Sequence, residues 1–209
     1  MIAALPLSFD SFAASEVLTG TFETIKAVSI AEVPGKAIAL EGLQLTLGDE
    51  CDLVASNDGS GTGYVGDVEM LLGAAGNANA QGSAVTAMSG TGCIASTTGG
   101  AIGIYEIDGA EGATVTVTVV DGQSTELDFA PNGCVGNYVA GVDGDSCDTI
   151  SDGTPAPVRL AGATDTGSLG EGTPVPGKTR VALGAKATAR TALTASTPYT
   201  VDFDINVTY

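Results

Sequence analysis

The sequence contains no histidine. Histidine is the commonest general base near neutral pH and the commonest zinc ligand, so its absence excludes Ser-His-Asp, Cys-His and His-Glu catalytic arrangements. Asp202 and Asp204 offer no substitute, because they lie two residues apart on a predicted strand and therefore on one face. Glycoside hydrolysis needs carboxylates on separate elements across a cleft. We therefore predict that the protein is not an enzyme and needs no cofactor.

Large aromatic side chains are also scarce. There is no tryptophan, and the 209 residues include only five Phe and five Tyr. Apolar residues make up 44% of the chain, which is enough for a folded core, but most are Ala and Val, which each bury little area. The length fits one domain or two small ones, and we see no boundary within it. Such a lean core implies that something else helps to stabilise the fold.

Basic residues are few. The chain has 25 acidic residues against 7 Lys and Arg, a net charge of −18, and no basic residue between Lys36 and Arg159. Nucleic acids and anionic membrane surfaces both require Lys and Arg, so neither is an expected partner. No apolar run reaches the roughly 18 residues that span a membrane. An acidic surface repels copies of itself at low salt, so salt-rich surroundings would suit this chain.

The four cysteines are spaced for disulfides rather than for a metal. None of their spacings is of the C-x-x-C kind that zinc and redox sites use, and an even number in a Gly-rich chain fits disulfides. Three pairings are possible, and buried or free thiols are the alternative. We favour Cys51 with Cys93 and Cys134 with Cys147, because the second pair would enclose a short acidic loop. Disulfides would place the protein in a periplasm or outside the cell.

The first residues, M-I-A-A-L-P-L-S-F-D-S-F-A, have some features of the end of a secretory signal, with Ser11-Phe12-Ala13 as a small-x-small site. The match is poor, because there is no basic region before the apolar run and Pro6 and Asp10 interrupt it. We expect this segment to begin a mature chain from which an upstream signal peptide has been removed.

Alternation of apolar and polar residues dominates the chain and predicts half-buried strands. It is clearest at Thr114 to Val119, Val181 to Ala189 and Val201 to Tyr209. Further strands are predicted at Thr19 to Val33, Lys36 to Leu47, Tyr64 to Leu72, Ser83 to Ala95, Ala101 to Ile107, Thr125 to Phe129 and Pro157 to Ala161. In the second of these the apolar phase slips at Gly42, which predicts a β-bulge or bend. Turn residues separate the strands, for example P-N-G at 131 to 133. About ten strands without a helical period predict an all-β antiparallel sandwich or barrel.

Two local patterns have chemical readings. The acidic loop with Asp143, Asp145 and Asp148 could collect oxygen ligands for Ca²⁺, but it lacks the spacing of an EF-hand, and a solvated loop is the better interpretation. Asn206-Val207-Thr208 matches a glycosylation acceptor, but it lies inside the most regular predicted strand, so chance explains it better.

The predicted strand at the carboxyl end has an apolar face that must be buried and an edge that must pair with other strands. Its apolar face comprises Val201, Phe203, Ile205, Val207 and Tyr209. These side chains must be buried, and the backbone groups need partners on both sides or an exposed edge remains. The first residues offer a second alternating stretch, in which Leu5, Leu7 and Phe9 are separated by Pro6 and Ser8. Residues 3 to 9 would extend about 23 Å, which is long enough to serve as a strand for a neighbour.

Four segments together resemble a known group of proteins. The ending Y-T-V-D-F-D-I-N-V-T-Y is similar to the final strand of chaperone-usher pilins and of secreted pilin-like sandwich domains of otherwise unknown function. Three further segments are similar to that second group, namely T-G-T-F-E-T-I-K-A-V-S-I-A-E-V, I-Y-E-I-D-G-A-E-G-A-T-V-T-V-T-V and R-V-A-L-G-A-K-A-T-A-R. The resemblance covers about a third of the chain and does not extend to the cysteine-bearing regions 48 to 95 and 130 to 178.

The resemblance implies an Ig-like, pilin-like β-sandwich that is completed by a strand from a neighbouring subunit. Residues 1–15 would form a donor strand and hinge, and residues 16–209 a single sandwich domain. Leu5, Leu7 and Phe9 would be the donor side chains, and the apolar face from Val201 to Tyr209 would line the acceptor groove. The protein would then be the major pilin of an extracellular surface filament of identical subunits, with a periplasmic chaperone as its partner during assembly.

Two alternatives stay open from the sequence. The first segment could instead be a strand of its own sandwich or an arm packed on the same subunit. The protein could also be a monomeric cell-surface adhesin or a sandwich that binds glycans or Ca²⁺, for which exposed aromatic residues in loops would be the sign. Only Tyr64 and Tyr138 qualify as such residues.

Overall fold

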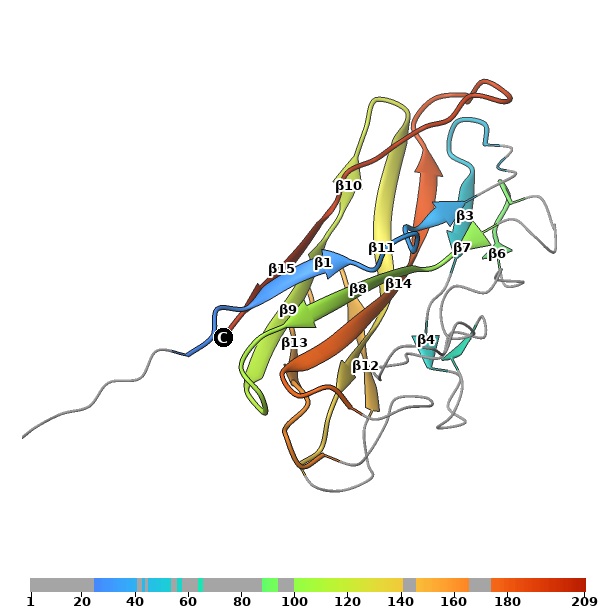
Figure 1. Ribbon diagram of the computed structural model, residues 1–209. Helices are drawn as coiled ribbons and strands as arrows, with labels where there is room; N and C mark the ends of the chain where they lie inside the picture. Colours follow the sequence, from blue (N-terminus) through green and yellow to red (C-terminus); the bar gives the residue numbers. More distant parts are fainter. Residues whose placement is uncertain are drawn as a thin grey trace, which may run out of the picture.

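A computed structural model gives the fold of the chain (Figure 1). It describes residues 25–40, 43, 45–53, 56–57, 64–65, 88–93, 100–140, 146–165 and 174–209. Every regular element in these ranges is a β-strand, and every pair of strands is antiparallel. The predicted all-β, antiparallel class is therefore confirmed. The predicted bulge at Gly42 lies outside the described residues.

The larger sheet is built around β14 (Lys178–Ala189), the longest strand. On one side β14 pairs with β8 (Gly103–Asp108) and then with β3 (Glu50–Leu53). On the other side it pairs with β11 (Leu127–Asn137). The outer positions belong to β1 (Ser29–Glu32) beside β8, β6 (Met88–Ser89) beside β3, and β10 (Gly122–Gln123) and β12 (Ser146–Ser151) beside β11.

The smaller sheet has three strands in the order β13, β9, β15. These are β13 (Ala156–Arg159), β9 (Thr114–Val120) and β15 (Asp204–Thr208). Two short ladders lie outside both sheets: β2 (Ala39–Leu40) with β7 (Gly100–Ala101), and β4 (Ser56–Asn57) with β5 (Tyr64–Val65).

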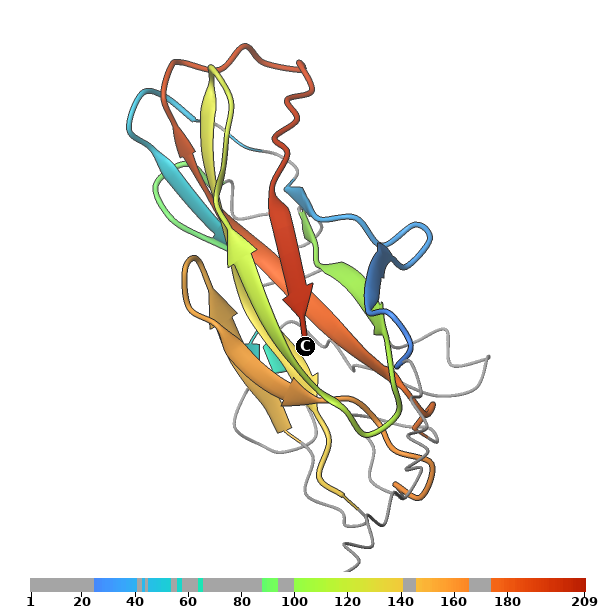
Figure 2. The same cartoon turned by 90° about the vertical axis from the view of Figure 1, so that its left-hand side faces the viewer.

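The two sheets face each other across one hydrophobic core, so the described residues form a β-sandwich (Figure 2). Its fully buried members come from both layers: Val115, Val117, Val119 and Val158 from the smaller sheet, and Ile107, Val135, Ile150, Val181 and Leu183 from the larger one. Their neighbours along each strand point away from this core. A period of two thus produces one apolar face on each sheet, as the alternation predicts.

Two disulfides involve strands of the larger sheet. Cys51 of β3 is joined to Cys93, with 5.0 Å between the Cα atoms. Cys134 of β11 is joined to Cys147 of β12, with 5.3 Å between the Cα atoms. This is the pairing that the sequence favoured. Cys134 also lies in a second buried cluster, on the opposite face of the sheet from the main core, with Ile102, Ile104 and Tyr138. The disulfides indicate an oxidising compartment, and they reinforce a core that contains few large side chains.

Two sequence-based interpretations are wrong. The Pro131-Asn132-Gly133 turn lies inside β11, where Pro131 is opposite Ala185 of β14. Proline is tolerated there because β11 changes its outer partner at this point, from β10 beside Phe129 to β12 beside Asn132. Asp148, which was expected in an acidic loop, lies in β12 opposite Val135 of β11, whereas Asp143 and Asp145 lie outside the described residues.

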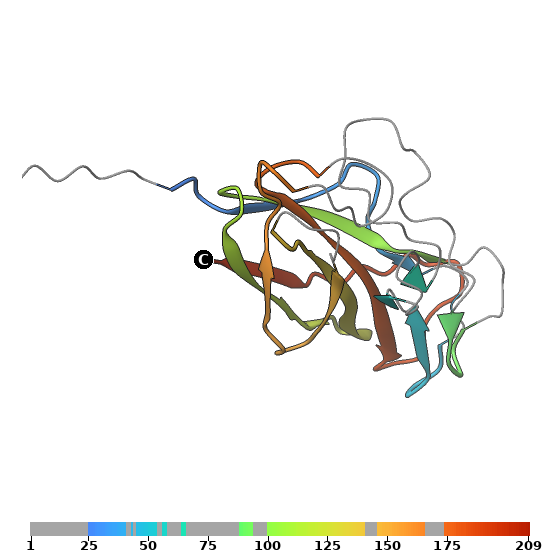
Figure 3. The same ribbon diagram turned by 90° about the horizontal axis from the view of Figure 1, so that it is seen from below.

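The two long sides of the sandwich differ. On one side the chain passes from β12 in the larger sheet to β13 in the smaller sheet, and Gly153 between them donates its N–H to Val119 O at 3.3 Å. That crossing closes the sandwich. On the other side lie β1 and β15, which are near each other but share no ladder. The start of β1 and the end of β15 lie at the same end of the molecule (Figure 3).

Candidate functional site

The side of the sandwich between β1 and β15 is its candidate functional site, and we call it the open edge. Among the described residues, β15 pairs only with β9 and β1 pairs only with β8. Each strand therefore presents one row of backbone N–H and C=O groups to no strand of the described chain. Figure 2 shows β15 with β9 on one side and β1 at an interval on the other.

The apolar side chains of β15 point inward but are only half buried. Ile205 is opposite Val119 and Val207 opposite Val117, and both pack against the main core. Val117 and Val119 themselves are fully buried. The outward residues of β15 are Asp204, Asn206 and Thr208, all exposed. A strand in the interior of a sandwich has its inward side chains fully covered, so the cover at β15 is incomplete.

Aromatic residues line the middle of the open edge. The Phe203 ring meets Tyr105 of β8 edge to face, with 5.9 Å between centroids, and lies 5.5 Å from the Phe129 ring of β11. Phe203 thus connects the smaller sheet to the larger one. Burial, and secondarily the negative charge of Glu32 on β1, raises the pKa of the Tyr105 hydroxyl to about 12, so it stays protonated in the physiological range.

The β1 side of the open edge is also apolar and half buried. Val28 and Ile30 pack on the same core as Ile205 and Val207, from the opposite sheet. Apolar side chains with incomplete cover therefore face each other from both layers, and no described strand lies between them.

The charges around β15 are acidic. Asp202 and Asp204 are exposed, and the Asp121 carboxyl follows β9 directly. Desolvation, with smaller contributions from Asp152 and Asp128, raises the pKa of Asp121 above its usual range. An incoming chain with acidic side chains would be repelled here, whereas an uncharged apolar segment would not.

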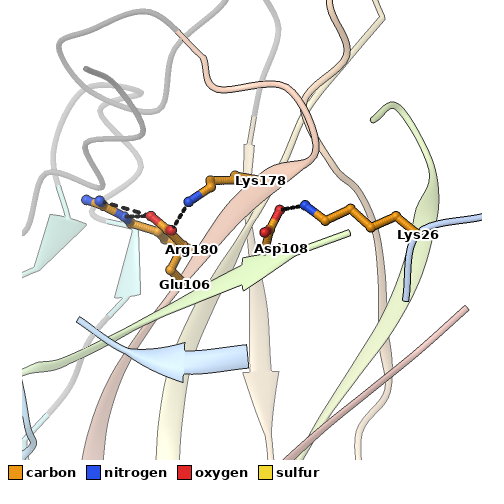
Figure 4. Close-up of polar contacts among 5 residues, drawn as sticks. All are labelled: Lys26, Glu106, Asp108, Lys178 and Arg180. Carbon is orange, nitrogen blue, oxygen red and sulfur yellow. Dashed lines mark hydrogen bonds and ion pairs between the residues drawn. The ribbon is translucent and has the colours of Figure 1, made fainter. Parts of the chain in front are cut away.

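The basic residues are engaged elsewhere. On the outer face of the larger sheet, Glu106 accepts from both Lys178 and Arg180, and Asp108 pairs with Lys26 at 2.6 Å (Figure 4). Three further ion pairs join Arg159 to Asp165, Lys186 to Glu50 and Arg190 to Asp128. At least six of the 7 basic residues are therefore in ion pairs, and the 25 acidic residues of the chain far outnumber its basic ones.

The structure brings some of the predicted acceptor residues together and separates others. Phe203, Ile205 and Val207 lie on the open edge, whereas Val201 packs on a separate cluster with Leu127 and Ala189. Tyr209 is 46% exposed at the end of the strand. The predicted donor residues Leu5, Leu7 and Phe9 lie outside the described residues. No sequence pattern assigns Val28, Ile30 and Tyr105 to this site, because only strand pairing and layer order place them opposite β15.

The described residues give little support to the predicted Ca²⁺ loop or to the predicted glycan-binding aromatic residues. Asp143 and Asp145 lie outside them, and the Asp148 carboxylate accepts from the Asn137 amide at 2.8 Å. No group of three residues that could hold a metal occurs in the ranges described. Tyr138 is not an exposed loop aromatic as expected, since it is 1% exposed within the second core. Its ring is large and apolar enough to be drawn into that core despite its position after a strand.

Comparisons with family models, with curated proteins and with solved structures find no match for this chain. The described ranges also hold no helix of the length and apolarity needed to cross a membrane. The candidate site therefore depends on the geometry of the open edge alone.

Proposed function

We propose that the protein is the structural subunit of an extracellular filament and that it polymerises by donating residues 3 to 9 to the open edge of the next copy. The observation that carries the proposal is the pair of unpaired edges, β1 and β15, with half-buried apolar side chains from both sheets between them. An edge of this kind invites a further strand, whose main-chain bonds give affinity and whose alternate side chains fix the register. The added strand would complete an Ig-like sandwich.

The amino-terminal segment has the properties of such a strand. Residues 1 to 9 carry no charged side chain, so they avoid repulsion from Asp202 and Asp204. A seven-residue strand of about 23 Å covers the five-residue β15, which spans about 17 Å. Burying Leu5, Leu7 and Phe9 contributes at most about 5–9 kcal/mol before the entropy of ordering is subtracted.

Donation to a neighbour is favoured over return to the same subunit by the path of the chain. Residue 25 enters the described part at the end of β15 where Tyr209 lies. A segment that turned back there by the shortest route would run antiparallel to β1 but parallel to β15, whereas a donated strand can run antiparallel to β15, as β9 does on its other side. Donation from one copy to the next is heterologous and does not close, so its product is a filament. Before assembly the open edge would need cover, which is the role of a periplasmic chaperone.

The test compares the full chain with a chain lacking residues 1 to 13. We expect electron microscopy to show filaments of the full chain and monomers of the truncated one. A peptide of residues 1 to 13 should bind the truncated monomer and raise its Tm. A matched peptide with Leu7→Asp should bind at least tenfold more weakly, because it would bury a carboxylate. Filaments of the truncated chain, or equal binding of both peptides, would overturn the proposal.

A further inference from the structure

The end of β15 is tied to the beginning of the described chain by one side chain. The Tyr209 hydroxyl donates to the Lys26 carbonyl at 2.5 Å and accepts from the Ala110 N–H at 2.8 Å. Lys26 and Tyr209 are 183 residues apart in sequence. The contact therefore joins the end of β15 to the first described residues that follow the segment which the proposed function assigns as donor.

A glycine at position 109 leaves the space that the Tyr209 hydroxyl occupies. A Cβ on Gly109 would lie 2.9 Å from the Tyr209 oxygen and 2.8 Å from the Leu160 side chain, so a larger residue would displace one of them. Gly109 is itself fixed, since its N–H donates to Gly177 O at 2.9 Å. The tyrosine ring is half exposed, and its burial contributes little to the core. Its hydroxyl contacts are thus the main specific feature of this residue.

Lys26 is held at two points. Tyr209 binds its backbone carbonyl, and Asp108 binds its ammonium group at 2.6 Å. The ion pair is solvent exposed and weakens as salt rises, whereas the hydroxyl bond is not screened in this way. Immediately before this anchor, Ile25 is 68% exposed. The chain is therefore held at residue 26, and residue 25 directly before it is exposed to solvent.

We infer that Tyr209 is a positioning residue that couples the open edge of a subunit to its own donor segment. The inference rests on the proposed function. A strand added beside β15 would give it a second ladder and reduce its local opening, which would keep Tyr209 on the Lys26 carbonyl. A subunit whose open edge is filled would then present its donor segment from a fixed point, and donation would be faster. Linkage requires the coupling to act in both directions on binding.

A single-step assay tests this coupling. The full chain, with its open edge filled by the peptide of residues 1 to 13, can donate but cannot accept. The truncated chain lacking these residues can accept but cannot donate. Mixing them gives a dimer and no longer product, so the rate of dimer formation measures donation alone. Tyr209→Phe, which removes the hydroxyl and keeps the ring, is placed first in the donating chain and then in the accepting chain.

We expect Tyr209→Phe in the donating chain to slow dimer formation about two- to tenfold, the factor associated with one hydrogen bond. In the accepting chain it should slow dimer formation less than in the donating chain, and peptide binding by that chain shows that the variant is folded. Hydrogen exchange at residues 25 to 28 of the filled full chain should also become faster in the variant. An unchanged rate in the donating chain, or equal slowing in either chain, would overturn the inference and leave the proposed function standing. Failure of the unsubstituted chains to form a dimer would overturn both.

Discussion

Charged residues in this protein differ widely in their expected contribution to the free energy of unfolding. The Asp165 carboxylate has 1% of its side chain exposed and accepts from Arg159 Nη1 and from the Gly162 N–H, each at 2.6 Å. It joins the end of β13 to the turn that follows. Lys186 and Glu50 form a pair at 2.8 Å with both side chains more than two-fifths exposed. Pairs in water contribute little, whereas a buried pair that loses one member leaves an uncompensated charge.

We therefore expect Asp165→Ala to lower the free energy of unfolding by about 3–5 kcal/mol, because the Arg159 guanidinium would lose its partner in a partly buried site. Glu50→Ala, the matched exposed variant, should change it by less than about 1 kcal/mol. Urea unfolding of the truncated monomer measures both without interference from polymerisation. Similar losses of unfolding free energy in the two variants would show that burial does not determine how much these ion pairs stabilise the fold.

Among the strands, some could be predicted from local alternation and others only from their pairing in the sheet. The alternation in Val115, Val117 and Val119 predicted β9 because a half-buried strand requires it. The same reasoning missed β3 and β12, because each is a short strand in which only two apolar residues lie among charged or polar ones. It also read Pro131 as a turn, since proline usually ends a strand and only the change of partner along β11 permits it here.

The incomplete cover of β15 has a measurable consequence. Ile205 is half buried at the open edge, whereas Ile107 of β8 is fully buried in the same core. In the truncated monomer, Ile107→Ala should cost about 2–5 kcal/mol in unfolding free energy and Ile205→Ala about half as much. When the donor peptide is bound, the cost of Ile205→Ala should rise, because the peptide would bury what the strand leaves exposed. A cost that stays the same with and without peptide would contradict the open edge as the binding site.

For the whole molecule, composition anticipated the class of fold and the compartment better than it anticipated the site. The even number of cysteines and the small apolar residues pointed to a disulfide-linked sandwich. The acceptor residues Phe203, Ile205 and Val207 could be listed from alternation on one strand. Val28 and Ile30, which face them from the other sheet, could not be listed in this way. Their position depends on which strands form the two edges once both sheets have assembled. That information is held in strand pairings such as β1 with β8 and β15 with β9, whose paired residues lie more than 70 positions apart, and no local pattern carries it.

The net charge of −18 makes a prediction about assembly as a whole. Six of the 7 basic residues are already in ion pairs within the subunit, so they do not attract a second copy. Two approaching subunits therefore repel each other, and the repulsion reaches about 30 Å at 0.01 M salt but only about 3 Å at 1 M. We expect the rate of filament formation, followed by light scattering, to increase at least tenfold over this range. Sucrose at equal osmolality, which screens no charge, is the control and should have a much smaller effect. A rate that falls as salt rises would mean that attraction between opposite charges guides assembly, and the acidic surface would then need a basic partner that this chain does not provide.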